Sequence, residues 1–420
     1  MPSFDRAPLH RQLAEIRTQL AASNAYIHSL DDNTLDQQIR LAGMPAPTGH
    51  EAERATWVSQ AFRALGYASS LDDVGNVIAS SGPTNAARPM SPVVCMAHLD
   101  TVFDDQTSLA LTREGNRFLC PGIGDNSRGL AVMLTLAQVF QETPNGSERA
   151  TRPIEFVATV GEEGLGNLRG ARAYFVNRNN VGLPSPSAVL VLDGPGDQHI
   201  VHHALGSRRY RVTFRGSGGH SWVDYGAPNA IHAASRAAAW LADVPRIQHG
   251  HVALTVSGIG GGESMNAIPG HAWIEVDVRA TDQELLMRVD SELRRIVNAA
   301  LEAEISSQSG AGREQEQFSR AKSAFQSNII LLGERPASVL PQEHSLVRLA
   351  QAATQLYHIE PVSAVASTDA NIPLSLGIPA IAIGGGGIGG GAHTVHEWYE
   401  NFNAPRGVAR AFAMLAALVG

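Results

Sequence analysis

The chain has 420 residues, of which 32 are Lys or Arg and 40 are Asp or Glu, so its formal charge is −8. Its two cysteines, Cys95 and Cys120, exclude a disulfide scaffold and a zinc site built from thiolates. The acidic balance argues against binding to nucleic acid or to an anionic membrane, and the sequence shows neither an apolar bilayer span nor the apolar core of a signal peptide. We therefore expect a soluble, cytoplasmic protein of two or three domains.

Helices are predicted for the first 65 residues. One amphipathic helix is indicated by an apolar stripe at three- and four-residue spacing, made of Leu9, Leu13, Ile16 and Leu20. After a break at residues 45–55, a second helix is expected to run to Gly66, with Thr48 or a neighbouring residue as its cap.

From residue 74 the pattern changes to short apolar runs that alternate with helical patterns. Strands are predicted at residues 74–80, 91–98, 154–161 and 187–193, and helices at residues 128–140 and 166–177. This alternation is typical of βαβ units, so it predicts an α/β fold with a mostly parallel sheet that helices cover on both faces.

A second pattern begins near Gly206. Polar and apolar residues alternate in 208–218, 253–260 and 271–280, as expected of a sheet with one wet face, and helical patterns occupy 227–244 and 281–304. This predicts an inserted α+β domain over residues 207–334, an antiparallel sheet with two helices, in which the polar segment 306–317 is a surface loop. Strand and helix alternation then resumes, so residues 1–206 and 335–420 are expected to form the main domain.

Ionisable side chains stand where the predicted strands of the main domain end, which is where open α/β folds build their sites. These residues are His98, Asp100, Asp125, Glu162, Glu163, Asp193 and His393. A single His-x-Asp or Glu-Glu pair is unremarkable and is usually a solvated surface feature. Their recurrence at successive strand ends is informative, because a charge there is costly unless it is paired or bound to a metal.

Imidazoles and carboxylates suit Zn²⁺ or a similar divalent ion, and a carboxylate can bridge two ions. Two such ions can polarise a carbonyl and activate water, and a carboxylate that is not a ligand must then take the proton. Adjacent side chains diverge, so one member of the Glu162–Glu163 pair can bind metal while the other faces the water. Asp100 lies on the same side of an extended segment as His98 and can accept a hydrogen bond from the second nitrogen of that imidazole.

Six segments together carry a resemblance to a known family: MAHLDTV, PGIGDNSRGLAVML, VATVGEEGLGNLRGAR, VLDG, GSGGHSW and GGGGIGGGAHTVHEWY. In order and spacing they resemble the superfamily of peptidase T, carboxypeptidase G and aminoacylase, which are co-catalytic dinuclear zinc hydrolases. The resemblance covers nearly the whole chain. It implies two divalent metal ions, Zn²⁺ or alternatively Co²⁺ or Mn²⁺.

The resemblance also implies a role for each residue at the strand ends. Asp125 would bridge two ions, the first held by His98 and Asp193 and the second by Glu163 and His393. Glu162 would be the general base, and Asp100 would orient His98.

His396 is an alternative to His393 as a ligand. In the family the ligand histidine stands four residues before a Glu and an aromatic residue, and His393 fits this register with Glu397 and Trp398. The glycine run 384–391 resembles a phosphate cradle only superficially, because no Lys-Ser/Thr follows it. Beside His393 it is better explained as backbone that approaches the metals and the substrate closely.

The inserted domain resembles the family's lid and dimerisation domain, so a homodimer through this domain is expected. His220 matches a histidine that stabilises the oxyanion and often comes from the partner subunit. Asn266 and Arg279 match positions that contact substrate, and the planar fork of Arg279 suits a carboxylate. The alternative for Arg279 is an ordinary surface arginine at a sheet edge.

These features predict hydrolysis of an amide bond in a small peptide or an N-acyl amino acid. Asp193 is an aspartate, as in peptidase T-like aminopeptidases, whereas carboxypeptidase G-type members use glutamate. This favours an exopeptidase that acts on di- or tripeptides, although aminoacylase-like deacylases also have aspartate there. A carboxypeptidase, a non-catalytic binding protein that kept the fold, and a nucleotide-binding protein that uses the glycine run are the remaining alternatives.

Overall fold

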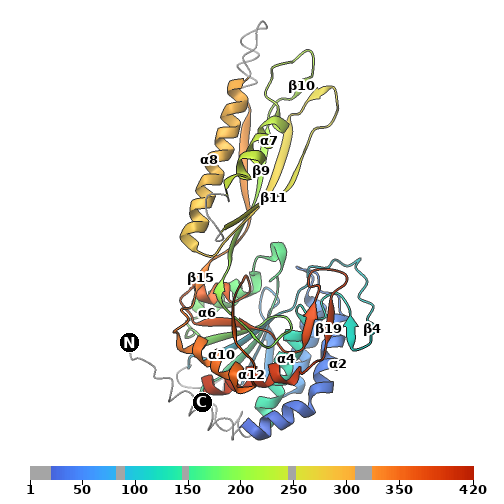
Figure 1. Ribbon diagram of the computed structural model, residues 1–420, viewed down its shortest axis with the longest axis vertical. Helices are drawn as coiled ribbons and strands as arrows, with labels where there is room; N and C mark the ends of the chain where they lie inside the picture. The colour runs from blue at the N-terminus through green and yellow to red at the C-terminus, as the bar shows by residue number, and fades with distance from the viewer. Residues whose placement is uncertain (1–19, 82–89, 144–150, 245–251, 308–323) are drawn as a thin grey trace. The chain divides into compact units, whose positions relative to one another are not determined.

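The computed structural model describes residues 20–81, 90–143, 151–244, 252–307 and 324–420. The chain divides into two compact units (Figure 1). Unit 1 comprises residues 1–204 and 339–420, and unit 2 comprises residues 205–338. The fold class predicted from the sequence is confirmed, since a mostly parallel sheet with helices occurs together with a separate antiparallel sheet.

Unit 1 is built on a central sheet of nine strands. In chain order these are β1 (Ala68–Leu71), β2 (Val77–Ser81), β3 (Val93–His98), β6 (Ile154–Thr159), β7 (Ala188–Leu192), β8 (His199–Ala204), β15 (Ser338–Val339), β16 (Val362–Ala366) and β17 (Ala380–Ile383). Their order in the sheet is β1-β2-β6-β3-β7-β17-β8-β15, and β16 pairs with β8. The four strands β6, β3, β7 and β17 run parallel, so their carboxyl ends meet at one edge of the sheet.

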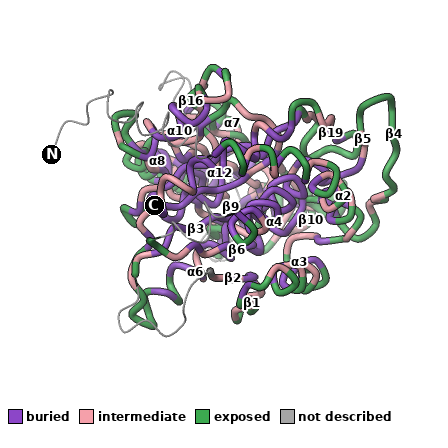
Figure 2. Tube along the Cα trace, turned by 90° about the horizontal axis from the view of Figure 1, so that it is seen from below, coloured by how far each residue is buried: buried purple, intermediate pink, exposed green. Residues whose placement is uncertain are grey.

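Helices cover both faces of this sheet, because β3 and β7 are buried at every position. The helices of unit 1 are α2 (Asp31–Ala42), α3 (Ala52–Ala64), α4 (Ser127–Glu142), α6 (Arg169–Asn180), α10 (Ser345–Leu356), α11 (Asn371–Ser375) and α12 (Pro405–Val419). Helix α4 is apolar around nearly its whole circumference, since it packs against β3, α2 and α12 and lies in the buried interior (Figure 2).

A small antiparallel sheet also belongs to unit 1 and was not predicted from the sequence. Its strands are β4 (Thr112–Glu114), β5 (Arg117–Leu119), β18 (Ile388–Gly390) and β19 (Trp398–Glu400), in the order β18-β19-β5-β4. Each strand has three residues, which is too few to produce a recognisable alternation of polar and apolar side chains.

Unit 2 contains the predicted antiparallel sheet with two helices. Strands β9 (Gly206–Arg215), β11 (Val252–Gly261), β13 (His271–Ala280) and β14 (Gln326–Arg335) pair in the order β11-β13-β9-β14. Apolar residues on one face, such as Val212, Ile274 and Val276, form a core with α7 (Ala230–Leu241) and α8 (Gln283–Ser307). Two short strands, β10 (Gly219–His220) and β12 (Ala267–Ile268), pair with each other in a separate antiparallel sheet.

Several details of the sequence analysis need correction or lie outside the described residues. The second helix was expected to be capped by Thr48 or a neighbouring residue. Thr48 is not the cap, because α3 begins at Ala52 with Glu51 at its N-cap position, and the Thr48 hydroxyl donates to Asp100 instead. Strand β8 was not predicted, since its three histidines conceal the apolar pattern. Most of the first predicted helix and of the loop 306–317 lies outside the described residues, although residues 20–29 are helical. Among the helices in the described ranges, none combines the length and apolar character that crossing a bilayer requires.

Candidate metal centre

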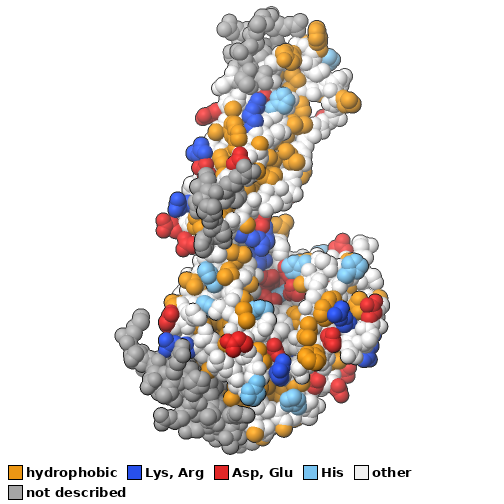
Figure 3. All heavy atoms as spheres, viewed as in Figure 1, with side chains coloured by type: hydrophobic (Ala, Val, Ile, Leu, Met, Phe, Trp, Pro, Cys, Tyr) orange, Lys and Arg blue, Asp and Glu red, His pale blue; other side chains and the backbone are white. Residues whose placement is uncertain are grey.

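The candidate residues of unit 1 converge at the edge where the parallel strands end. His98 is the last residue of β3 and pairs in register with Thr159, the last residue of β6. Glu162 and Glu163 follow β6 within four residues, and Asp193 directly follows β7. On the face drawn in Figure 3, acidic and histidine side chains gather on the surface of unit 1.

Two groups of possible metal ligands share one carboxylate. The inner half-site, as we name it, consists of His98, Asp125 and Asp193, and the outer half-site consists of Asp125, Glu163 and His393. Within each group the ligand atoms lie within 4.8 Å of one another, and a third group joins His98, Glu162 and Glu163. None of the groups found among the described residues contains His396, which is exposed on the same hairpin as His393.

In the inner half-site His98 is buried, whereas Asp125 and Asp193 are partly exposed. The Nε2 atom of His98 lies 3.0 Å from Oδ1 of Asp125 and 3.8 Å from Oδ1 of Asp193. The His98 side chain is only 2% exposed. Burial alone would lower the pKa of His98, but the neighbouring carboxylates of Asp100, Asp125 and Asp193 outweigh it and hold this pKa well above its usual value.

Asn126 supports the inner half-site through hydrogen bonds to the backbone around Asp193. It is the N-cap residue of α4, and its Oδ1 accepts hydrogen bonds from the backbone amides of Gly129 and Gly194, each at 3.1 Å. Its Nδ2 donates to the carbonyl oxygen of Leu192 at 2.9 Å. Asn126 therefore holds the residues on both sides of Asp193, which sets that carboxylate beside the start of the helix that follows Asp125.

The outer half-site depends on the hairpin between β18 and β19. The Nε2 atom of His393 lies 3.1 Å from Oδ2 of Asp125 and 3.0 Å from Oε1 of Glu163. The His393 side chain is 54% exposed, and its backbone is left-handed, with φ of 63°. Hydrogen bonds to Asp125 and Glu163 raise the pKa of His393 to about 10. The two oxygens of Asp125 thus face the two histidines, as a shared ligand would.

Glu397 joins the hairpin to the loop that carries Asp125. Its buried carboxylate accepts backbone hydrogen bonds from Gly122 at 2.7 Å and from Gly124 and Asp125 at 2.8 Å. Burial raises the pKa of Glu397 to about 7, although these amides oppose the shift. From the sequence, Glu397 served only to set the register of His393. Its position four residues after that histidine was the one available signal of this role.

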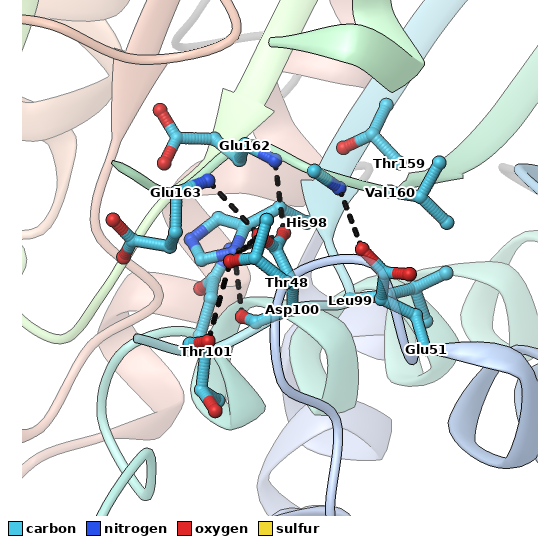
Figure 4. A network of polar contacts seen from close by, with 12 residues as sticks. Thr48, Glu51, His98, Leu99, Asp100, Thr101, Thr159, Val160, Glu162 and Glu163 are labelled. Carbon is cyan, nitrogen blue, oxygen red and sulfur yellow. Dashed lines mark hydrogen bonds and ion pairs between the residues drawn. The ribbon is translucent and has the colours of Figure 1, made fainter. Parts of the chain in front are cut away.

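Asp100 holds the backbone that carries both glutamates (Figure 4). Its Oδ1 accepts from the amide of Glu162 and its Oδ2 from the amide of Glu163, each at 2.9 Å, and Thr48 donates to Oδ2 at 2.8 Å. The Nδ1 atom of His98 lies nearer the backbone oxygen of Asp100, at 3.0 Å, than its carboxylate, at 3.5 Å. Burial opposes the charge on Asp100, but the contacts with His98 and the Glu163 amide lower its pKa.

Asp369 is a buried acid near this centre that the sequence analysis missed. Its side chain is 1% exposed, accepts a hydrogen bond from the hydroxyl of Thr159, and has a pKa that burial raises to about 6. The signal was present in STDAN, a polar run directly after the residues that form β16.

The three candidates of the inserted domain all lie in unit 2. His220 is exposed on β10, and its Nδ1 accepts backbone hydrogen bonds from Trp222 at 3.2 Å and Val223 at 3.3 Å. In the neutral ring, these contacts assign the proton to Nε2.

The structure brings Asn266 close to His220 but places Arg279 on a different sheet. The backbone oxygen of Asn266 accepts from the amide of Ser221, while its Oδ1 contacts the hydroxyl of Ser264 at 2.6 Å. Arg279 lies on β13, and its Nε donates to Oδ2 of Asp277 at 2.8 Å.

Comparisons with known proteins agree with this architecture. The family model described as Peptidase family M20/M25/M40 matches residues 94–419. Among curated proteins, the alkaline phosphatase isozyme conversion protein of Escherichia coli (strain K12) is 31% identical over 140 residues, a match that covers 30% of this chain and 38% of that protein. The chain therefore matches well under half of that relative's length.

Solved structures share the fold over almost the entire chain. Aminopeptidase PepT from Bacillus cereus ATCC 10987 has a TM-score of 0.69 at 20% identity, over 93% of this chain and 99% of that one. A tripeptidase from Staphylococcus aureus subsp. aureus mu50 has a TM-score of 0.73 at 19% identity, over 93% and 98%. The Bacillus subtilis YXEP protein, a dinuclear metal binding peptidase, has a TM-score of 0.65 at 16% identity, over 93% and 99%.

Proposed function

The chain belongs to peptidase family M20/M25/M40 and is a metal-dependent hydrolase of peptide or amide bonds, and we propose that it is a peptidase T-like exopeptidase acting on di- or tripeptides. The observation that carries the proposal is the pair of ligand groups that share Asp125, with Glu162 in a third group beside His98 and Glu163.

The side chains of the two half-sites fit two divalent metal ions. His98 and Asp193 would hold one ion, Glu163 and His393 the other, and Asp125 would contribute one oxygen to each. Imidazole and carboxylate ligands suit Zn²⁺, and Co²⁺ and Mn²⁺ accept the same set. Bound there, the ions would polarise the scissile carbonyl and acidify water.

Glu162 is the proposed general base. Its carboxylate belongs to the ligand group with His98 and Glu163 but to neither half-site, so it lies within reach of the centre without being needed as a ligand. It would accept a proton from the attacking water as the water oxygen bonds to the carbonyl carbon. The same proton would then pass to the leaving nitrogen as the C–N bond breaks.

His220 is the proposed donor to the oxyanion. The contacts of its Nδ1 with two backbone amides place the ring proton of the neutral form on Nε2, and an oxyanion requires such a donor. Asn266 lies beside His220 and is proposed to contact substrate, as is Arg279, whose guanidinium would bind a substrate carboxylate.

A variant with Glu162→Gln tests the mechanism. Because Gln has nearly the same shape but cannot take a proton, we expect kcat to fall by roughly 100- to 10,000-fold, while both metal ions remain bound. Metal content by mass spectrometry and kcat on a peptide would be measured on the same sample. Undiminished activity would contradict the mechanism, whereas loss of metal would show that Glu162 is a ligand.

A deacylase of N-acyl amino acids is the second candidate, since the aspartate at Asp193 occurs in both groups of the family. A panel of free tripeptides, tripeptides with a blocked amino end and N-acetyl amino acids would separate the two. We expect turnover of the free peptides only. Turnover of the acetylated compounds alone would replace the exopeptidase proposal by the deacylase.

We further propose that the chain forms a homodimer through unit 2. Strand β11 lies at the edge of its sheet, and a ten-residue edge strand offers unpaired backbone groups to a second copy. Light scattering coupled to size exclusion should give twice the chain mass of 44.6 kDa. A monomer at micromolar concentration would contradict this proposal.

A further inference from the structure

Glu51 is a buried carboxylate that the mechanism above does not use. It occupies the N-cap position of α3, yet its side chain makes no capping hydrogen bond with that helix. Its Oε1 instead accepts hydrogen bonds from the amide of Gly49 at 2.8 Å and from the amide of Gly161 at 3.0 Å. Gly161 is 110 residues away in sequence and directly precedes the proposed base, Glu162.

Two carboxylates therefore hold three successive backbone amides. Glu51 accepts from Gly161, and Asp100 accepts from Glu162 and from Glu163, at distances of 2.9 to 3.0 Å (Figure 4). Hydrogen bonds to an ionised acceptor are stronger than those between neutral groups. Gly161 also has φ of 62°, so the turn depends on an unusual backbone conformation at the residue that Glu51 contacts.

The burial of Glu51 indicates that its position serves this turn. The side chain is only 4% exposed, and the nearest cation is Arg169, whose guanidinium lies 3.5 Å from both carboxylate oxygens. A buried carboxylate is costly unless hydrogen bonds and charges compensate it. A residue needed only to cap α3 would place its oxygen on the first amides of that helix, near the surface.

We propose that Glu51 is a positioning residue that acts on the general base through the backbone of residues 161–163. With Asp100, it sets where the Glu162 carboxylate stands relative to the two half-sites. This inference rests on the proposed function of Glu162. Displacement of the base would slow the chemical step and leave substrate binding largely intact, so the effect should be in kcat rather than in KM.

The experiment compares four variants of the full-length, metal-loaded protein: Glu51→Ala, Glu51→Asp, Glu51→Gln and, as a matched control, Glu53→Ala. Glu53 is an exposed carboxylate in the first turn of the same helix, so its removal tests loss of charge near that helix end. For each variant we would measure kcat, KM, metal content and the melting temperature with the best peptide substrate.

We expect Glu51→Ala to lower kcat by roughly 10- to 100-fold, in line with the cost of misplacing a catalytic group by about 1 Å. Glu51→Asp keeps the charge but shortens the side chain, so it should lose nearly as much. Glu51→Gln keeps an oxygen at the same reach and should lose the least of the three. KM and metal content should change little, and Glu53→Ala should match the unsubstituted protein.

If the Glu51→Asp variant has the same kcat as the unsubstituted protein, the proposal is overturned. This test holds even if the Glu51→Ala variant does not fold. The proposal is also overturned if kcat falls only in proportion to lost metal or lost folded protein, or if Glu53→Ala shows the same loss. Glu162→Gln separates this failure from failure of the proposed function. If Glu162→Gln is inactive and the Glu51 variants are fully active, only the role of Glu51 fails, whereas an active Glu162→Gln removes the proposed function itself.

Discussion

The histidine of the inner half-site ends a strand of the central sheet, whereas the histidine of the outer half-site is carried by a hairpin of the small sheet. Both half-sites use Asp125, but the His98 side chain is 2% exposed and the His393 side chain is 54% exposed. His98 ends a strand that pairs with β6 and β7 on its two sides. His393 stands in a loop between two three-residue strands.

Different interactions hold the two histidines in place. The Nδ1 atom of His98 contacts the backbone of Asp100 inside a packed core, so both sheet pairing and burial fix the ring. The position of His393 depends on Glu397, whose carboxylate joins the hairpin to the Asp125 loop by three hydrogen bonds. We infer that the inner half-site is set by the fold itself, and that the outer half-site can lose its geometry while the fold remains.

The largest expected effect comes from Asp125→Ala, because this substitution removes the one ligand that both half-sites share. The affinity for both ions should fall, and activity should vanish. The loss of affinity should exceed the roughly 10- to 100-fold that is typical when a metal ligand loses its hydrogen-bond partner. Equilibrium dialysis with zinc and a peptide assay would measure both effects. Asp73→Ala, at an exposed position, is the control. Retention of two ions by Asp125→Ala would contradict the shared role.

Much of the inner half-site could be predicted from the sequence because it follows strand ends. A parallel sheet brings the carboxyl ends of its strands to one edge, so residues far apart in sequence, such as His98 and Asp193, must come together there. The apolar runs that precede these residues made the strands recognisable. The architecture of unit 2 was predictable for the same reason, since ten-residue strands show a clear alternation.

Apart from Asp100, the residues that support the site through backbone contacts were not predicted from the sequence. Glu51 and Glu397 act by accepting hydrogen bonds from backbone amides 110 and 272 to 275 residues away, and an amide carries no residue-type signal. Thr48 was one candidate for a helix cap because local patterns favour that role, but its hydroxyl donates to Asp100. Long-range contacts to the backbone override such local preferences.

Replacing one histidine at a time should separate the two half-sites. His393→Gln should keep the fold and one ion per chain, because its side chain lies largely in solvent. His98→Gln should lose the inner ion and also destabilise the metal-free protein by about 1–3 kcal/mol, since it leaves buried polar groups without their partner. Metal stoichiometry and urea unfolding of the metal-free variants would test this. Equal loss of stability in the two variants would contradict the distinction between the half-sites.

The smallest expected effect is the release of a proton when metal binds, and it follows from the pKa of about 10 for His393. At pH 7 the metal-free protein carries a proton on this ring, but a ligand histidine must be neutral, so metal binding releases the proton and strengthens as pH rises toward 10. The stability of the metal-free protein depends on pH in the opposite direction. A folded-state pKa above the ordinary 6.5 gives stability that is complete below pH 6.5 and is lost as pH rises through 10.

Calorimetric titration with zinc at pH 7, in two buffers of different ionisation enthalpy, counts the protons released. His393→Gln should release about one proton fewer than the unsubstituted chain, because the outer half-site then has no imidazole to deprotonate. The melting temperature of the metal-free protein should fall between pH 7 and pH 10, and less so in His393→Gln. If both proteins release the same number of protons, the charge at the outer half-site in the absence of metal is not on His393, and the exposed hairpin is not where metal and proton compete.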